Sequence, residues 1–190
     1  MNYLDLCKRL AQEAGISGPG PATTVSQTGQ LKRVVDWTNQ AWQDIQKMRT
    51  DWLFMNKEFT FNTVAGTRDY YAPDYSITNV DRWDNQSFLI YETALGESDQ
   101  NKLEFLSYRK WRDAYRVRMN VRPNARPQQF TFMPENNAIR FESRPNKIYT
   151  INGEYKRTAQ VFSANADNPT GFPAEFHMMI VWKALQFYAL

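Results

Sequence analysis

The sequence predicts an α+β fold, in which helices from both chain ends form a small helical bundle around a central antiparallel β layer that is sandwich- or barrel-like. Apolar residues recur at helical spacing in residues 3–51 and again in 173–190, whereas apolar and polar residues alternate between them. Helical and strand patterns that are segregated along the chain are typical of α+β proteins. A chain of 190 residues also suits one domain with a substantial core.

Two amphipathic helices are expected at the start of the chain. Residues 3–14 follow a plausible N-cap, Asn2, and end before Gly15, which favours a helix stop. Residues 30–51 form the second helix, since one face collects its apolar side chains. These are Leu31, Val34, Val35, Thr38, Ala41, Trp42, Ile45 and Met48. A loop rich in Gly, Pro, Thr and Ser is expected between them, at residues 16–28.

The central region predicts strands. Residues 58–62 and 68–73 flank the turn at 65–67 and predict a hairpin. Further strands are expected at 76–83, 87–92 and 102–106, followed by a short basic helix near 108–118. Strands at 129–133, 138–142 and 148–156 predict a three-strand meander. We expect a single domain over residues 1–190, with a helical part at about 3–55 and 172–190 and a β-rich part at about 56–162.

The last helix, residues 173–190, is apolar around most of its circumference. Pro173 suits its first turn, and only Glu175, Lys183 and Gln186 form a polar line. A helix this apolar is expected to pack on more than one side, against the second helix and against the β layer or a neighbouring subunit. Because no Gly or Asn stop follows Tyr188, we also expect the natural helix to continue past Leu190.

Composition excludes several classes of protein. The net charge of +3 does not by itself indicate a polyanion partner, and the single Cys7 excludes an internal disulfide. No stretch has the length and apolar character of a targeting or spanning segment, so no membrane association is expected. Aromatic residues are abundant, with 12 Phe, 10 Tyr and 6 Trp, which suits a thick core or surfaces that become buried on assembly.

Catalytic chemistry finds no support in the sequence. The only histidine, His177, lies in an apolar run and is better explained as a half-buried helix residue than as a catalytic base or metal ligand. Phosphate-loop, dinucleotide and zinc-protease motifs do not occur. We therefore expect no enzyme, no cofactor and no metal site.

One basic segment departs from the average composition. Residues 109–126 contain Arg109, Lys110, Arg112, Arg116, Arg118, Arg122 and Arg126, with Trp111 and Tyr115 interleaved and Asp113 as the one acid. Arginines with aromatic residues can serve a protein interface, a solvated helix face or a nucleic-acid groove. We rank the interface first and the groove last, because no basic excess elsewhere extends a groove.

Four segments carry a family resemblance. They are residues 31–46 (LKRVVDWTNQAWQDIQ), 52–55 (WLFM), 65–70 (AGTRDY) and 172–185 (FPAEFHMMIVWKAL). Together they resemble, in order along most of the chain, the head-to-tail adaptor (connector) proteins of tailed bacteriophages. The resemblance implies a structural virion protein at the head-tail junction, made in the host cytoplasm. It further implies a ring, usually twelve-fold, that binds the portal protein and tail or tail-terminator proteins while genomic DNA passes through its channel.

Two other functions stay open from the sequence. An aromatic-rich β layer could be a carbohydrate-binding module that stacks sugars on Trp83, Tyr91 or Trp111. A single-strand nucleic-acid binder could use Phe130, Phe132 and Phe141 beside the basic segment, although core phenylalanines are commoner.

Overall fold

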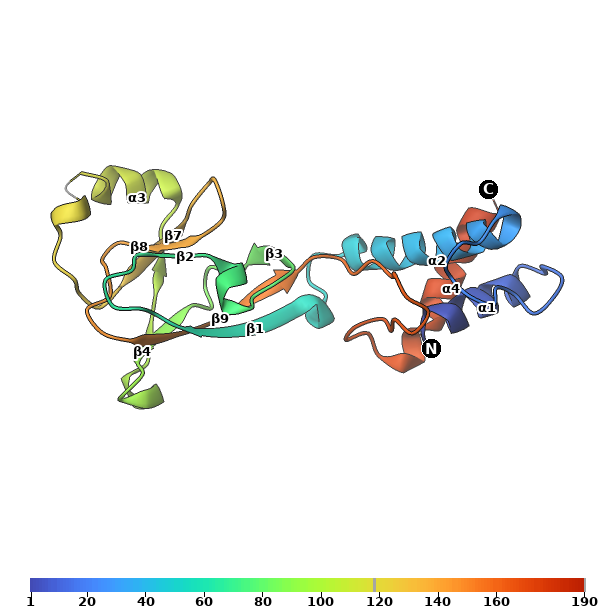
Figure 1. Ribbon diagram of the computed structural model, residues 1–190, viewed down its shortest axis with the longest axis horizontal. Helices are drawn as coiled ribbons and strands as arrows, with labels where there is room; N and C mark the ends of the chain where they lie inside the picture. Colours follow the sequence, from blue (N-terminus) through green and yellow to red (C-terminus); the bar gives the residue numbers. More distant parts are fainter. Residues whose placement is uncertain (118, 190) are drawn as a thin grey trace. The chain divides into compact units, whose positions relative to one another are not determined.

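The computed structural model describes residues 1–117 and 119–189 and confirms the α+β class. The chain divides into two compact units (Figure 1). The helical unit consists of Met1–Met55 and Thr158–Leu190, and the β unit consists of Asn56–Arg157. The terminal segments of the chain therefore meet in one unit, and each unit has its own apolar core. That the whole chain acts as one adaptor domain stays a prediction.

The first helix, α1, spans Tyr3–Glu13 and begins as expected at Asn2. The Asn2 side chain accepts a hydrogen bond from the backbone N–H of Asp5 at 2.8 Å, and the Asp5 carboxylate accepts one from the backbone N–H of Asn2 at 3.2 Å. This reciprocal capping satisfies two of the N–H groups that a helix start leaves without partners.

The second helix, α2, spans Gly29–Met48 and provides the centre of the helical core. It ends earlier than expected, because Arg49 adopts an extended conformation, and a short 3₁₀ turn follows at Leu53–Met55. Trp42 is fully buried, and its ring lies 5.3 Å from that of Phe172 and 6.0 Å from that of Phe162. The loop that returns from the β unit is thereby attached to α2.

The last helix, α4, spans Met178–Tyr188, and a 3₁₀ turn at Ala174–Phe176 precedes it after Pro173. Ile180, Val181 and Ala184 are buried against α1 and α2, so the expected packing on the second helix is confirmed. The opposite side of α4 stays exposed in the single chain.

The first sheet of the β unit is centred on the long strand β9, Tyr149–Arg157. Strand β1, Asn56–Asn62, pairs with one edge of β9. Strands β3, Val80–Trp83, and β4, Leu89–Glu92, share the other edge end to end. The short β5, Asn101–Lys102, adds to β4. Short 3₁₀ turns at Ala72–Tyr75 and Gly96–Asp99 lie in the connections.

The second sheet has the order β2-β8-β7-β6. Its strands are Asp69–Tyr70, Ile139–Phe141, Gln129–Phe132 and Glu104–Phe105, and the β6–β7 pair alone is parallel in this sheet. Apolar side chains from both sheets form one core, so the arrangement is sandwich-like and does not close into a barrel. Core members from both sheets include Phe59, Phe61, Ile90, Ile151, Tyr70, Phe130, Ile139 and Phe141.

The predicted hairpin between residues 58–62 and 68–73 is wrong. The chain does turn at Gly66, but β1 pairs with β9 and β2 pairs with β8 in the other sheet. β9 gives β1 seven paired residues, whereas β2 has only two. The turn is held by a backbone hydrogen bond from the N–H of Thr67 to the carbonyl of Val64 at 3.0 Å, and the Tyr70 hydroxyl also donates to the carbonyl of Thr67 at 2.8 Å.

The predicted three-strand meander is half right. β7 and β8 form the expected hairpin, with Phe130 opposite Phe141 and Phe132 opposite Ile139. β9 does not continue it and instead becomes the centre of the first sheet. The buried Pro145 lies between β8 and β9, and the missing N–H of proline disfavours continued strand pairing there.

Candidate functional site

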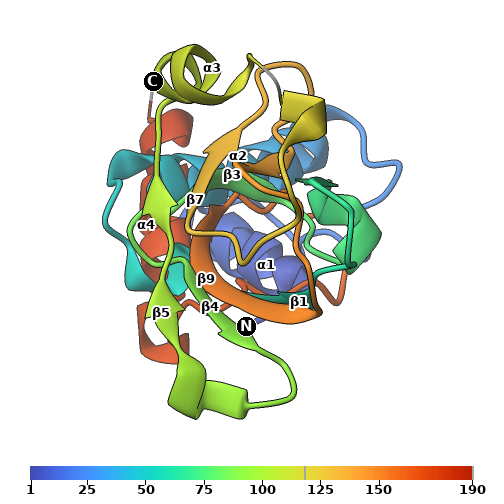
Figure 2. The same cartoon turned by 90° about the vertical axis from the view of Figure 1, so that its left-hand side faces the viewer.

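The basic segment begins with a helix that is attached to the sandwich. Helix α3, Tyr108–Tyr115, packs against β7, an inner strand of the second sheet (Figures 1 and 2). Trp111 anchors it, being only 1% exposed, and the guanidinium of Arg140 from β8 lies 5.6 Å from the centre of the Trp111 ring. Trp111 was a candidate interface residue, but in the single chain its indole is covered by its own sheet.

The outward side of α3 carries positive charge. Arg109, Lys110 and Arg116 are exposed, and Arg112 forms an ion pair at 2.9 Å with the neighbouring Asp113. Arg118 lies outside the described residues. The helix thus presents three cations to solvent beside one ion pair, and the rank of an interface over a solvated face stays a prediction.

Tyr115 and Arg122 hold the end of the basic segment. The Arg122 guanidinium lies 4.7 Å from the centre of the Tyr115 ring and donates a hydrogen bond to the carbonyl of Ala114 at 3.2 Å. Tyr115 in turn donates to the Gln129 side chain on β7. These contacts direct both residues toward the protein, and each keeps part of its surface exposed.

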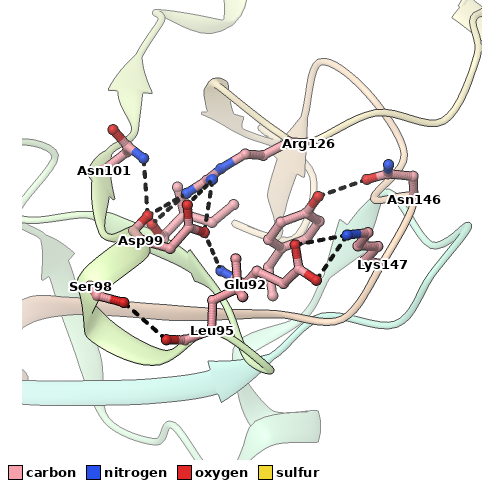
Figure 3. Close-up of polar contacts among 10 residues, drawn as sticks. Glu92, Leu95, Ser98, Asp99, Asn101, Arg126, Asn146 and Lys147 are labelled. Carbon is pink, nitrogen blue, oxygen red and sulfur yellow. Dashed lines mark hydrogen bonds and ion pairs between the residues drawn. The ribbon is translucent and has the colours of Figure 1, made fainter.

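Arg126 has a structural role that sequence spacing could not reveal. Its Nη1 donates to both carboxylate oxygens of Asp99 at 2.8 Å, and its Nη2 donates to the carbonyls of Asp99 and Ile90 at 2.8 and 3.2 Å (Figure 3). The Arg126 guanidinium holds the pKa of the Asp99 carboxyl below its usual value. Lys147 and Glu92 form a second ion pair beside this one, at 2.9 Å. The network fastens the loop after α3 to the first sheet.

A second candidate surface lies in the helical unit. Phe176, Met179 and Trp182 are exposed along one side of the last helical segment, and we call them the outer α4 face. Beside it is an apolar groove of about 630 Å³. Its apolar lining consists of Trp52, Leu53, Phe54, Phe172, Pro173 and Phe176. Exposed apolar patches are common at sites of protein association and at ligand-binding grooves, so we treat this surface as a candidate interface.

His177 links the start of the last helix to the N-terminus of the chain through polar contacts. Its Nε2 lies 3.1 Å from the Phe172 carbonyl and its Nδ1 lies 2.9 Å from the amino group of Met1. The ring is buried, and this agrees with a packing role. Across residues 1–117 and 119–189, no group of His, Cys, Asp and Glu side chains could hold a metal ion. In the same residues, no helix is both long enough and apolar enough to span a membrane.

Four of the six candidate residues of the two alternative functions are buried, whereas Tyr91 and Phe132 are half-buried. Trp83 and Trp111 are buried, so neither ring is available for stacking on a sugar. Phe130 and Phe141 are fully buried between the two sheets, so neither can stack on a base. The aromatic residues of the β unit build its core instead.

The exposed apolar and basic surfaces suit the class of structural proteins that contact other proteins. Comparison with known families supports this class: residues 1–189 match the family model described as SU10 adaptor protein. A comparison with curated proteins finds no match. The chain belongs to the SU10 adaptor protein family, which confirms the resemblance to bacteriophage head-to-tail adaptors. It is accordingly a structural adaptor and a component of the virion.

Proposed function

We propose that the protein assembles into a ring at the head-tail junction, where it joins the portal protein to the tail and lines the channel for DNA. The family match over residues 1–189 is the observation that carries this proposal. A closed ring uses two different surfaces of each copy, because one copy must contact both neighbours. The outer α4 face, which is apolar, and the outward side of α3, which is basic, are the exposed surfaces that we assign to contacts with neighbouring proteins.

Imaging of purified particles is expected to show a closed ring of this protein between head and tail. We expect twelve copies, the number that the adaptor resemblance implies. Electron microscopy with averaging over many particles measures both the position and the copy number. A single copy at a peripheral site of the particle would contradict the proposal, and a ring on the tail that does not touch the portal would contradict the joining role.

We further propose that the outward side of α3 forms contacts between proteins rather than reading DNA sequence. The double variant Arg112→Glu with Arg116→Glu is expected to reduce incorporation into particles about tenfold or more. The new glutamates would face the acidic groups of the partner that the arginines contact, and like charges juxtaposed at an interface are strongly unfavourable. Quantitative mass spectrometry of purified particles measures the incorporation.

The matched control is Lys57→Glu with Arg82→Glu, which makes the same change of net charge at exposed residues of β1 and β3. Its incorporation should equal that of the wild type. Free duplex DNA should bind the wild type only weakly and in a salt-sensitive way. Tight binding at physiological salt that the α3 variant loses would favour a nucleic-acid surface instead.

A further inference from the structure

Four arginines converge where the second sheet meets the segment after α3. Arg68 immediately precedes β2, and its carbonyl accepts a hydrogen bond from the N–H of Phe141 on β8 at 3.2 Å. Arg140 lies on β8 opposite Asp69, and Arg144 follows that strand. Arg122 follows the 3₁₀ turn at Met119–Val121, whose Met119 carbonyl accepts a hydrogen bond from Arg68 Nη2 at 2.7 Å. We call Arg68, Arg122, Arg140 and Arg144 the arginine cluster.

Arg68 is buried without a counter-ion. It is only 7% exposed, and its Nε atom is buried with no hydrogen-bond partner. The nearest acid in the sequence, Asp69, is taken by Arg140 in a bidentate ion pair. Among the described residues, Arg68, Arg122 and Arg144 form no ion pair. A buried charge is strongly unfavourable unless it is paired, so this cluster lacks an anion in the single chain.

The electrostatics of Arg68 agree with this geometry. Burial lowers the pKa of Arg68, and the positive charge of Arg144 lowers it further. Asp69 opposes the effect, whereas Arg140 and Arg122 add to it. At Arg68 the positive charges of Arg144, Arg140 and Arg122 together outweigh the attraction of Asp69, and an added negative group would relieve that repulsion.

We propose that the arginine cluster binds the carboxylate of an aspartate or glutamate side chain from a neighbouring protein in the assembled particle. Guanidinium groups recognise carboxylates through paired, charge-assisted hydrogen bonds, and the partly exposed Arg122 and Arg144 can donate to a ligand that arrives from outside, while the buried Arg68 contributes its charge. The identity of the ligand as a partner protein rests on the proposed adaptor function, whereas the anion site itself rests only on the geometry of the β unit.

A protein carboxylate fits the surroundings better than a phosphate of nucleic acid. Val117 and Val121, which flank this part of the segment, are 74% and 76% exposed, and apolar side chains gain nothing from a phosphate backbone. Arg122 and Arg140 already lie over the rings of Tyr115 and Trp111. Arginine with aromatic and apolar neighbours is the composition of a protein interface. The net charge of +3 also provides little long-range attraction for DNA.

The anion site can be tested on the isolated protein with inorganic phosphate as the probe. The midpoint of thermal unfolding is compared in sodium phosphate and in sodium chloride of equal ionic strength. We expect phosphate to raise the midpoint of the wild type by about 2–4 °C more than that of Arg144→Met. The control Arg82→Met, at an exposed position of β3, should keep the wild-type response. Equal responses of the wild type and Arg144→Met would overturn the site.

The source of the anion is tested by cross-linking in assembled particles that carry Arg144→Lys. A water-soluble carbodiimide joins an amine to a carboxylate by an amide bond, while the carbodiimide takes up the lost water as a urea. We expect mass spectrometry to find position 144 joined to an aspartate or glutamate of another polypeptide. The ion pair of Lys147 with Glu92, at 2.9 Å, serves as the internal control for the reaction.

Formation of the Lys147–Glu92 product without any intermolecular product at position 144 would overturn the carboxylate ligand. If the wild type bound duplex DNA tightly and Arg144→Met did not, the site would be assigned to the phosphates of nucleic acid instead. The phosphate measurement requires no assembly, so its failure counts against the anion site alone. Absence of a ring in particle images counts against the proposed function and leaves the phosphate result as it stands.

Discussion

Replacing Trp42 by alanine is expected to lower the free energy of unfolding of the helical unit by about 3–5 kcal/mol, the usual range for removing a large buried aromatic side chain. Trp42 is fully buried and contacts Phe54, Phe162 and Phe172, with ring centres 5.3 to 6.0 Å away. Its Nε1 also donates to Gln160 at 3.2 Å. Alanine would leave a cavity between α2 and the loop that returns from the β unit.

Urea denaturation followed by the helical circular dichroism signal measures this loss, because all three long helices belong to the helical unit. The matched control is Trp182→Ala, which removes the same side chain from an exposed position on α4. Its effect should stay within about 0.5 kcal/mol. Similar losses for the two variants would show that the Trp42 side chain is not the centre of this core.

The helices could be predicted from the sequence because their signals are local. The 3.6-residue spacing of apolar residues in α2 and the cap at Asn2 involve neighbours within a few positions. Strand positions were also predicted well, since alternation is a local pattern. The local pairing of β7 with β8 was also predicted, but the long-range pairing of β1 with β9 was not, because no local pattern encodes that choice.

Parts of the candidate sites could be predicted for the same reason. The apolar circumference of the last helix predicted a side that the single chain leaves exposed, and Trp182 lies on it. Trp111 carried a usable signal, since Tyr108, Trp111 and Tyr115 recur at helical spacing and form the side of α3 that faces the sheet. That Arg126 pairs with Asp99 could not be predicted, because the two residues meet only through the tertiary fold.

The arginine cluster shows the limit of reasoning from charge runs. Arg68 was predicted to begin the strand at 68–73, and Arg140 and Arg144 lie outside the basic segment. Only the pairing of β2 with β8 brings them together with Arg122. The basic segment therefore contains one of the four arginines on which the inferred site depends and omits the other three.

Replacing Trp182 by aspartate is expected to abolish ring assembly while leaving the fold intact. Trp182 is 59% exposed and shares the outer α4 face with Phe176 and Met179. A charge at this position therefore disturbs no core contact. If the outer α4 face packs against a neighbouring copy, as we propose, aspartate would become a buried, unpaired charge at each interface. Loss of a central tryptophan typically costs about 2 kcal/mol or more of binding free energy, which lowers the affinity of each contact about 30-fold.

Incorporation into particles and the thermal unfolding midpoint of the isolated protein measure the two halves of this prediction. The matched control is Gln12→Asp, which adds the same charge at an exposed position on α1 and should assemble normally. Ala184→Asp, two residues from Trp182 but fully buried, should instead unfold the helical unit. Normal incorporation of Trp182→Asp would place the outer α4 face on the free surface of the particle, and the contacts of the ring would then have to come from elsewhere in the chain.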